Sequence, residues 1–202
     1  PILIKASAGG GGIGMQIVNN FNELKSAIEK TKNLAKKAFG NSDIFLEKFI
    51  RNSRHIEIQV FGYGEKSAVH FYERDCSIQR RFQKIIEESP APKVEQSIIK
   101  KMAEMSVNFA SDQKYEGAGT IEFIYDIDQK KFYFLEMNTR IQVEHPVTEE
   151  ITGVDLVELQ IKYALNLDSK GILQGDISKN GNSLECRLYA EDPKKNFLPS
   201  PG

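Results

Sequence analysis

Alternating and helically spaced hydrophobic positions divide the chain into short strands and three helices. Alternation of apolar and polar residues predicts strands with one face on a core, and apolar positions three or four residues apart predict helices. Strands are expected at 1–6, 15–18, 44–49, 54–63, 67–75 and 183–191, with one further pair inside 118–145. Helices are expected at about 21–39, 95–111 and 155–166.

The first helix has the clearest end signals. Asn20 followed by Glu23 is a capping box, in which each residue satisfies a free backbone donor of the other. Gly40 is expected to end the helix, because glycine adopts the left-handed conformation without a steric penalty.

Hairpins mixed with helices, without regular βαβ alternation, indicate an α+β fold. We expect a largely antiparallel sheet flanked by helices, preceded by a small lobe in which residues 7–14 form a glycine flap between two strands. We place the boundary after residue 49, so that residues 1–49 form the flap lobe and residues 50–202 the larger part.

Composition excludes several classes of protein. With 202 residues, 40% of them hydrophobic, the chain can bury a core. No apolar run reaches the ~18 residues that a membrane helix requires, so no membrane partner is expected. Cys76 and Cys186 are too few for a disulfide scaffold and lack metal-ligand spacing.

Charge is distributed unevenly along the chain. Residues 1–101 hold 17 Lys and Arg against 11 Asp and Glu, whereas residues 102–202 hold 10 against 17. Two such halves are compatible with a metal-bound polyanion held between them, and equally with faces that are solvated differently. The distribution gives no indication of nucleic-acid binding.

The glycine run at 9–14, GGGGIG, fits neither a dinucleotide fingerprint nor a Walker loop. A strand and not a helix follows it, and no Lys-Ser or Lys-Thr pair closes it. It offers backbone N–H groups that can approach phosphate oxygens closely, with Lys5 as a nearby positive charge. A flexible loop without a ligand is the alternative.

Residues 136–144 alternate strictly. The even positions are all polar, so an extended chain places them along one face. These positions are Glu136, Asn138, Arg140, Gln142 and Glu144. A solvated strand gives the same alternation, but surface strands favour Lys and Thr over this mixture of carboxylate, amide and guanidinium groups.

Glu122 adds a second acid to this face. A hairpin centred on residue 129 places Glu122 directly across from Glu136, and two like charges about 5 Å apart are costly. A divalent cation between them removes the repulsion, and Mg²⁺ suits two carboxylates with an amide or water. Surface acids that happen to lie opposite one another are the alternative.

Seven short segments, in the order in which they occur along the chain, together match the pattern of a known family. They are KASAGGGG at 5–12, EKF at 47–49, RHIEIQV at 54–60, ERDCSIQRR at 73–81, GAGTIEF at 117–123, EMNTRIQVEHPVTE at 136–149 and ECR at 185–187. Together they resemble the biotin carboxylase family of ATP-grasp enzymes over nearly the whole chain. Other ATP-grasp enzymes, such as carbamoyl-phosphate synthetase, share the glycine flap and the paired acids but not the RIQVEHP run.

The resemblance implies an ATP-grasp fold and a ligase reaction with ATP and Mg²⁺ or Mn²⁺. In that reaction bicarbonate attacks the γ-phosphate of ATP, and the resulting carboxyphosphate delivers CO2 to N1 of biotin. The implied partners are a biotin carboxyl carrier domain or protein, a carboxyltransferase component, and a second copy in a full-length homodimer. A cytoplasmic location is expected, with the mitochondrial matrix as the alternative.

The resemblance also implies roles for single residues. The nucleotide contacts are Lys5, Gly10, Gly11, Gly12, Glu47, Lys48, Ile50, His55, Gln79, Glu122 and Glu136. The metal ligands are Glu122, Glu136 and Asn138. Lys84 reaches the reacting phosphoryl group, while Arg140, Gln142 and the Val143 backbone hold bicarbonate. Glu144 is the general base, and Arg187 stabilises the enolate oxygen of biotin.

Two residues depart from the family pattern. Phe82 stands where relatives often carry His or Asn, and Ile13 occupies a flap position that is often basic. Further parts of the family's N-terminal and C-terminal lobes are missing from the sequence. We therefore expect residues 1–49 to be part of the lid lobe and residues 50–202 to be an incomplete central lobe, inactive in isolation. A non-catalytic nucleotide-binding module and a different ATP-grasp carboxylate ligase are the alternative functions.

Overall fold

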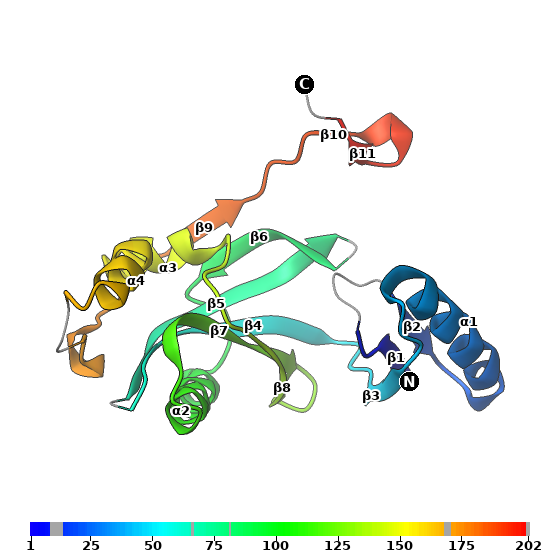
Figure 1. The fold of residues 1–202 in the computed structure, drawn as a ribbon, viewed down its shortest axis with the longest axis horizontal. Coiled ribbons are helices and arrows are strands. Elements are labelled where there is room, and N and C mark those ends of the chain that lie inside the picture. The colour runs from blue at the N-terminus through cyan, green and yellow to red at the C-terminus, as the bar shows by residue number, and fades with distance from the viewer. Residues whose placement is uncertain (9–13, 66, 81, 168–170, 201–202) are drawn as a thin grey trace. The chain divides into compact units, whose positions relative to one another are not determined.

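The computed structural model describes residues 1–8, 14–65, 67–80, 82–167 and 171–200. The chain divides into two compact units, one made of Pro1–Ser53 with Arg80–Gln83, the other of Arg54–Gln79 with Lys84–Gly202 (Figure 1). The flap residues Gly10, Gly11, Gly12 and Ile13 lie outside the described residues.

A three-stranded sheet carries the first unit. Its strands are β1 (Ile2–Ala6), β2 (Met15–Val18) and β3 (Ile44–Lys48), in the order β2-β1-β3. Both pairings are antiparallel, and Lys5 lies opposite Met15 in the first of them. The predicted hairpin of the first two strands is confirmed.

Helix α1 (Phe21–Phe39) begins after Asn20 and ends before Gly40 as predicted, but Glu23 accepts from the side-chain amide of Asn20 and not from its backbone N–H, so only half of the capping box forms. The Glu23 N–H donates to Asn20 Oδ1 over 3.2 Å, and the Asn20 amide donates to the Glu23 carboxylate over 2.5 Å. Gly40 ends the helix in the left-handed conformation, at φ 72°. Buried Ala27 packs with Ile4 and Val18 of the sheet, so one face of the helix completes a small core.

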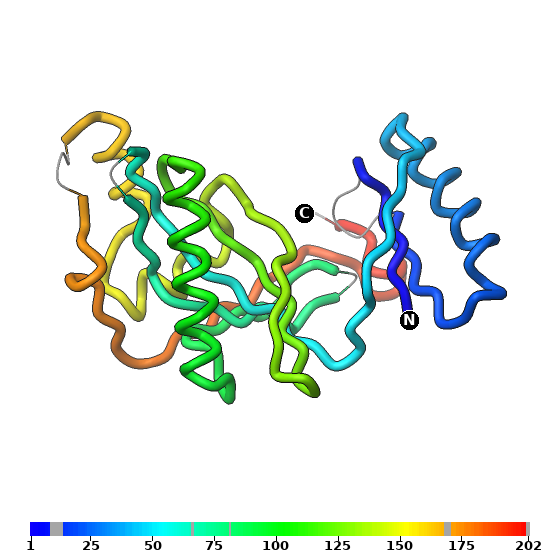
Figure 2. Tube along the Cα trace, turned by 90° about the horizontal axis from the view of Figure 1, so that it is seen from below, coloured from blue at the N-terminus to red at the C-terminus, as the bar shows by residue number. Residues whose placement is uncertain are grey.

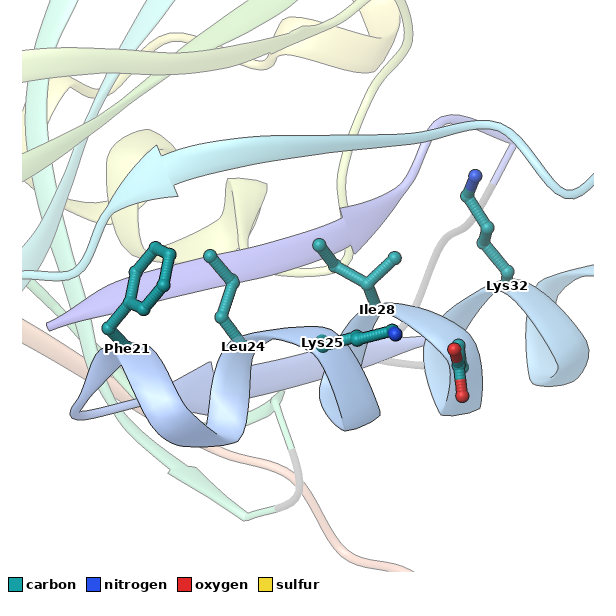
Figure 3. Close-up of a pocket in the computed structure, with 6 residues that line it drawn as sticks. Phe21, Leu24, Lys25, Ile28 and Lys32 are labelled. Atoms are coloured by element: carbon teal, nitrogen blue, oxygen red, sulfur yellow. The ribbon is translucent and has the colours of Figure 1, made fainter.

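A shallow groove runs along α1. It is lined by Phe21, Leu24, Lys25, Ile28, Glu29 and Lys32 (Figure 3). Phe21 is 86% exposed, and Figure 3 shows its ring on the same side of the helix as Leu24 and Ile28. None of the predicted site residues lines this groove.

The second unit is built on a six-stranded sheet with the order β8-β7-β4-β5-β6-β9. The strands are β4 (Ser53–Tyr63), β5 (Ala68–Arg80), β6 (Gln83–Ser89), β7 (Glu116–Asp126), β8 (Lys131–Asn138) and β9 (Ser183–Cys186). The pairs β4–β5, β6–β9 and β7–β8 are antiparallel, in agreement with the predicted sheet.

Three helices and several short elements complete this unit. The helices are α2 (Gln96–Asp112), α3 (His145–Thr152) and α4 (Leu156–Ala164), and the short elements are η1 (Gln174–Asp176), β10 (Glu191–Asp192), η2 (Pro193–Lys195) and β11 (Leu198–Pro199). Figures 1 and 2 show α2 against one side of the large sheet. No helix in the described part of the chain is long and apolar enough to cross a membrane.

The two faces of the large sheet differ in chemistry, and β4 shows why. Its residues Ile56, Ile58 and Val60 are fully buried in the core beneath α2. Because side chains alternate, the residues between them face the other way. On that face Phe61 and Tyr63 pack with α4, whereas Glu57 and Gln59 are fully buried polar groups. A buried polar region therefore lies beside an apolar region on the same face of the sheet.

Several boundaries differ from those expected. β5 continues to Arg80 beyond the predicted end at residue 75, and β6 was not indicated by the pattern. The strand expected at 183–191 ends at Cys186. Leu188 is 97% exposed, so the apolar position that suggested a longer strand does not pack on a core. Helix α3 was missed, although Pro146 in its first turn is a known helix-start signal.

Candidate active site on the large sheet

The ammonium group of Lys84, on β6, lies among three carboxylates. Its Nζ is 2.6 Å from Glu57 Oε2, 2.8 Å from Glu122 Oε1 and 2.5 Å from Glu144 Oε1. Burial opposes the charge of Lys84, but its negative neighbours, Glu57 first, outweigh that effect and raise its pKa. Lys84 therefore stays protonated and links β4, β7 and the start of α3.

Arg74, on β5, lies beneath this cluster and is completely buried. Its Nε donates to Glu57 Oε1 over 2.5 Å. Its Nη1 and Nη2 donate to Gln59, Thr148, Thr120 and Gln142, over distances of 2.7 to 3.1 Å. Burial alone would raise the pKa of Glu57, but Arg74 and Lys84 hold it well below the usual range. A buried charge network with satisfied donors thus fixes the floor of the site.

His55 approaches the same carboxylates from the start of β4. Its Nε2 lies 3.2 Å from Glu122 Oε2 and 3.5 Å from Glu57 Oε2. Burial lowers the pKa of His55, but the contacts with Glu122 and Glu57 outweigh it and raise the pKa to about 9. The pKa of Glu122 is lowered to about 2, because His55 and Lys84 outweigh the effect of burial.

Glu122 and Glu136 lie directly opposite each other in the β7–β8 pair, so the predicted pairing of these two acids is confirmed. Glu122 Oε1 also accepts hydrogen bonds from Asn138 Nδ2 over 2.9 Å and from Gln142 Nε2 over 3.0 Å. Glu136 is exposed on the neighbouring strand. Carboxylate and side-chain amide oxygens, which Glu122, Glu136 and Asn138 carry, are the hard donors that Mg²⁺ or Mn²⁺ prefers.

The predicted five-residue polar wall is wrong in its geometry. The strand ends at Asn138, so the alternation does not continue through Arg140 to Glu144. Gln142 and Glu144 are nevertheless buried in the site, because the turn before α3 carries them under Lys84 and Arg74. Arg140 stays exposed and donates to the Ile141 carbonyl, and Val143 is 57% exposed.

Arg187 enters the site from the segment after β9. Its Nη2 lies 2.9 Å from Glu144 Oε2 and 2.6 Å from Glu87 Oε1, and its Nε donates to the same Glu87 oxygen over 2.7 Å. Glu144, 2% exposed, therefore contacts both Lys84 and Arg187. The structure thus brings together residues that lie 60 and 43 positions apart in the sequence.

The remaining predicted residues occupy two places. Gln79 lies beside His55, with Nε2 3.2 Å from His55 Nδ1, and donates to the Cys76 carbonyl over 2.8 Å. In the first unit, Lys5 Nζ forms an ion pair of 2.6 Å with Glu47 on β3. Lys48 ends that strand and Ile50 is half-buried just after it.

Sequence reasoning missed Glu57, Arg74 and Cys76. The ligand atoms of Glu57, Cys76 and Glu144 lie within 4.8 Å of one another, as do those of His55, Glu57 and Glu122. Burial and Glu57 raise the pKa of Cys76, which therefore remains a thiol. The signal for Glu57 was its position in an apolar strand, two residues from Gln59 and on the same face.

Comparison with known proteins places the chain among its relatives. The family model "Carbamoyl-phosphate synthase L chain, ATP binding domain" matches residues 1–170. The chain belongs to this family. Biotin carboxylase 2 of Bacillus subtilis is 53% identical over 203 residues, which cover all of this chain and 45% of that protein.

Solved structures of family members agree. A biotin carboxylase from Campylobacter jejuni, in complex with β,γ-ATP, gives a TM-score of 0.92 at 47% identity, covering 100% of this chain and 44% of that one. The biotin carboxylase domain dimer of a Hydrogenobacter thermophilus 2-oxoglutarate carboxylase, with MgADP, ADP and bicarbonate, gives 0.89 at 50% identity, covering 98% and 44%. The predicted biotin carboxylase resemblance and the α+β ATP-grasp fold are confirmed, and the chain spans less than half the length of these relatives.

Proposed function

We propose that this chain is the ATP-binding part of a biotin carboxylase, which carboxylates biotin with bicarbonate and ATP through carboxyphosphate. The observation that carries the proposal is the contact set of Glu144, which lies 2.5 Å from Lys84 Nζ and 2.9 Å from Arg187 Nη2. The two cations attract a small anion such as bicarbonate and so bring its proton within reach of the buried Glu144 carboxylate.

In this proposal each residue of the cluster has one task. Glu144 accepts the proton of bicarbonate, whose oxygen then attacks the γ-phosphate and displaces ADP to give carboxyphosphate, while Lys84 balances the negative charge on the phosphoryl group. Arg140, Gln142 and the Val143 backbone hold bicarbonate, and Arg187 stabilises the enolate oxygen that biotin develops when N1 loses its proton. Arg74 and Glu57 keep Gln142 and Lys84 in position through the contacts described above.

We assign the metal and the nucleotide to two sets of residues that overlap at Glu122 and Glu136. Glu122, Glu136 and Asn138 would hold Mg²⁺ or Mn²⁺, which neutralises phosphate charge when bound. The proposed nucleotide contacts are His55, Gln79, Lys5, Glu47, Lys48 and Ile50, together with the acids Glu122 and Glu136. The backbone of Gly10, Gly11 and Gly12 is the proposed phosphate cradle.

The wider setting follows from the same proposal. Residues 1–49 would be part of the lid lobe of an ATP-grasp enzyme, and residues 50–202 an incomplete central lobe. A biotin carboxyl carrier, a carboxyltransferase component and a second copy of the parent protein are the proposed partners. The cytoplasm is the proposed location, as expected for relatives of bacterial biotin carboxylases.

A chimera tests the function directly. These 202 residues replace the matching segment of Bacillus subtilis biotin carboxylase 2, and phosphate release and carboxybiotin are measured with Mg-ATP, bicarbonate and biotin. We expect bicarbonate-dependent carboxylation by the chimera, and its loss in Glu144→Gln with Mg-ATP binding retained. Glu150→Gln, an exposed acid in α3, is the matched control and keeps full activity.

Two outcomes contradict the proposal. A folded chimera that binds Mg-ATP but forms no carboxybiotin would indicate a nucleotide-binding module without catalysis. Phosphate release that depends on a different carboxylate substrate would indicate another ATP-grasp ligase.

A further inference from the structure

Glu87 on β6 and Glu185 on β9 lie directly opposite each other in the antiparallel register. Residues that face each other across such a pair have Cβ atoms about 4.5–5.5 Å apart, and two like charges at that distance destabilise the sheet. Glu87 is fully buried. The structure therefore accommodates two acidic side chains where one buried charge is already costly.

One oxygen of each carboxylate has no hydrogen-bond partner among the described residues. These buried atoms are Glu87 Oε2 and Glu185 Oε2. The other oxygen of Glu87, Oε1, accepts both contacts from Arg187, of 2.7 Å to Nε and 2.6 Å to Nη2. Arg187 thus neutralises one charge of the pair, and no residue in the described part of the chain forms an ion pair with Glu185.

We propose that Glu87 and Glu185 share one proton through these two buried oxygens, and that the resulting singly charged pair holds Arg187 against Glu144. A protonated carboxyl group is a hydrogen-bond donor, so the shared proton satisfies both orphaned oxygens at once. It also leaves Arg187 between two single charges, the pair on one side and Glu144 on the other.

The surroundings of the pair support this arrangement. Burial raises the pKa of both glutamates, Arg187 acts against it, and the Glu144 charge adds to the rise. Arg187 and Glu144 act electrostatically on both glutamates, and His145 and Arg74 act on Glu185. Two carboxyls in one site titrate as a unit, and the repulsion between them raises the pKa at which the first proton binds.

Glu87 and Glu185 are thereby positioning residues for Arg187. The inference rests on the proposed function only for the role of Arg187 toward biotin, because proton sharing needs no substrate. Its test on the 202-residue chain therefore succeeds or fails independently of carboxylation activity.

The key variant is Glu185→Gln, whose amide donates to Glu87 permanently and imitates the protonated partner. Side-chain carboxyl carbons of ¹³C-labelled glutamate are followed by NMR as pH is varied. In the wild type we expect Glu87 and Glu185 to titrate together, above the ~4.3 of a free glutamate. In Glu185→Gln we expect the Glu87 midpoint to fall and the Arg187 Nε–H resonance to lose its pH-dependent shift.

Stability gives a second readout. The native pair binds one proton more than the unfolded chain, so the folding constant should fall by up to about tenfold per pH unit above the free glutamate range. Glu185→Gln should lack this fall. Glu88→Gln, the neighbouring acid with Leu184 opposite it, is the matched control and should keep both the fall and the Arg187 shift.

The inference is overturned if both carboxyls titrate in the free glutamate range, or if the Glu87 midpoint is the same in Glu185→Gln. It is also overturned if the Arg187 resonance does not follow the titration of the pair, because the glutamates would then not position Arg187.

Discussion

Glu122 faces Glu136 only because β8 carries one extra residue. On the turn side of the hairpin, Phe123 faces Phe134 and Asp126 faces Lys131, and the register shifts by one residue between Phe123 and Glu122. Leu135 is the residue left without a partner. Without this bulge, Glu122 would lie opposite Leu135 and Glu136 would point to the other face of the sheet.

We predict that Glu122 and Glu136 bind a divalent cation together. Glu136→Gln removes one charged ligand, so Mn²⁺ binding in the presence of ATP should weaken by at least about tenfold, or ~1.4 kcal/mol. Free Mn²⁺ is measured by electron paramagnetic resonance on the chimera. Glu104→Gln, an exposed acid on α2, should change nothing, and equal affinity of both variants for Mn²⁺ would remove Glu136 from the metal site.

Arg74 should be the most stabilising charged residue of the site. Arg74→Met leaves Glu57 buried without its strongest countercharge, and breaking a buried pair in this way costs about 3–5 kcal/mol. Urea unfolding of the 202-residue chain measures the loss. Combining Arg74→Met with Glu57→Leu should recover part of the lost stability, since the uncompensated charge of Glu57 is then gone. No recovery would contradict the view that Arg74 stabilises the fold by compensating the charge of Glu57.

The stability of the chain should depend on pH through His55. The folded pKa of about 9 lies above the ordinary 6.5, so the protonated His55 stabilises the folded state fully below pH 6.5. This contribution is lost as pH rises through about 9. Relative to His55→Gln, the wild type should lose on the order of 2–3 kcal/mol between these values, measured by urea unfolding with a chelator present.

His70 is the control for this measurement. Burial lowers the pKa of His70, and Lys179 adds to the effect, so its sign is opposite. Relative to His70→Gln, the wild type should lose stability as pH falls below the ordinary histidine range. The same trend for both histidines would contradict the ion pairs assigned to His55.

A feature of the fold or of the site was predictable from the sequence where the residues that determine it lie close together along the chain. The α1 ends were predictable because Asn20, Glu23 and Gly40 act within a few residues of the helix. Glu122 and Glu136 were placed opposite each other by assuming a symmetric hairpin, and the bulge at Leu135 made that pairing correct although the turn-side pairs differ. The contact of Arg74 with Glu57 was not predictable, because it joins two strands whose register no local pattern specifies.

The last prediction separates stability from activity at Arg140. Its side chain is exposed and its described hydrogen bond goes to the Ile141 carbonyl, so Arg140→Ala should change the free energy of unfolding by less than about 0.5 kcal/mol. If Arg140 holds bicarbonate, the loss of a charge-assisted contact worth about 1.5–3 kcal/mol should lower carboxylation by the chimera on the order of ten- to a hundredfold. The KM for Mg-ATP should stay within about twofold, because no nucleotide contact is removed. Steady-state rates with bicarbonate and Mg-ATP varied in turn provide both numbers, and an equal loss of ATP affinity would place Arg140 on the phosphates instead.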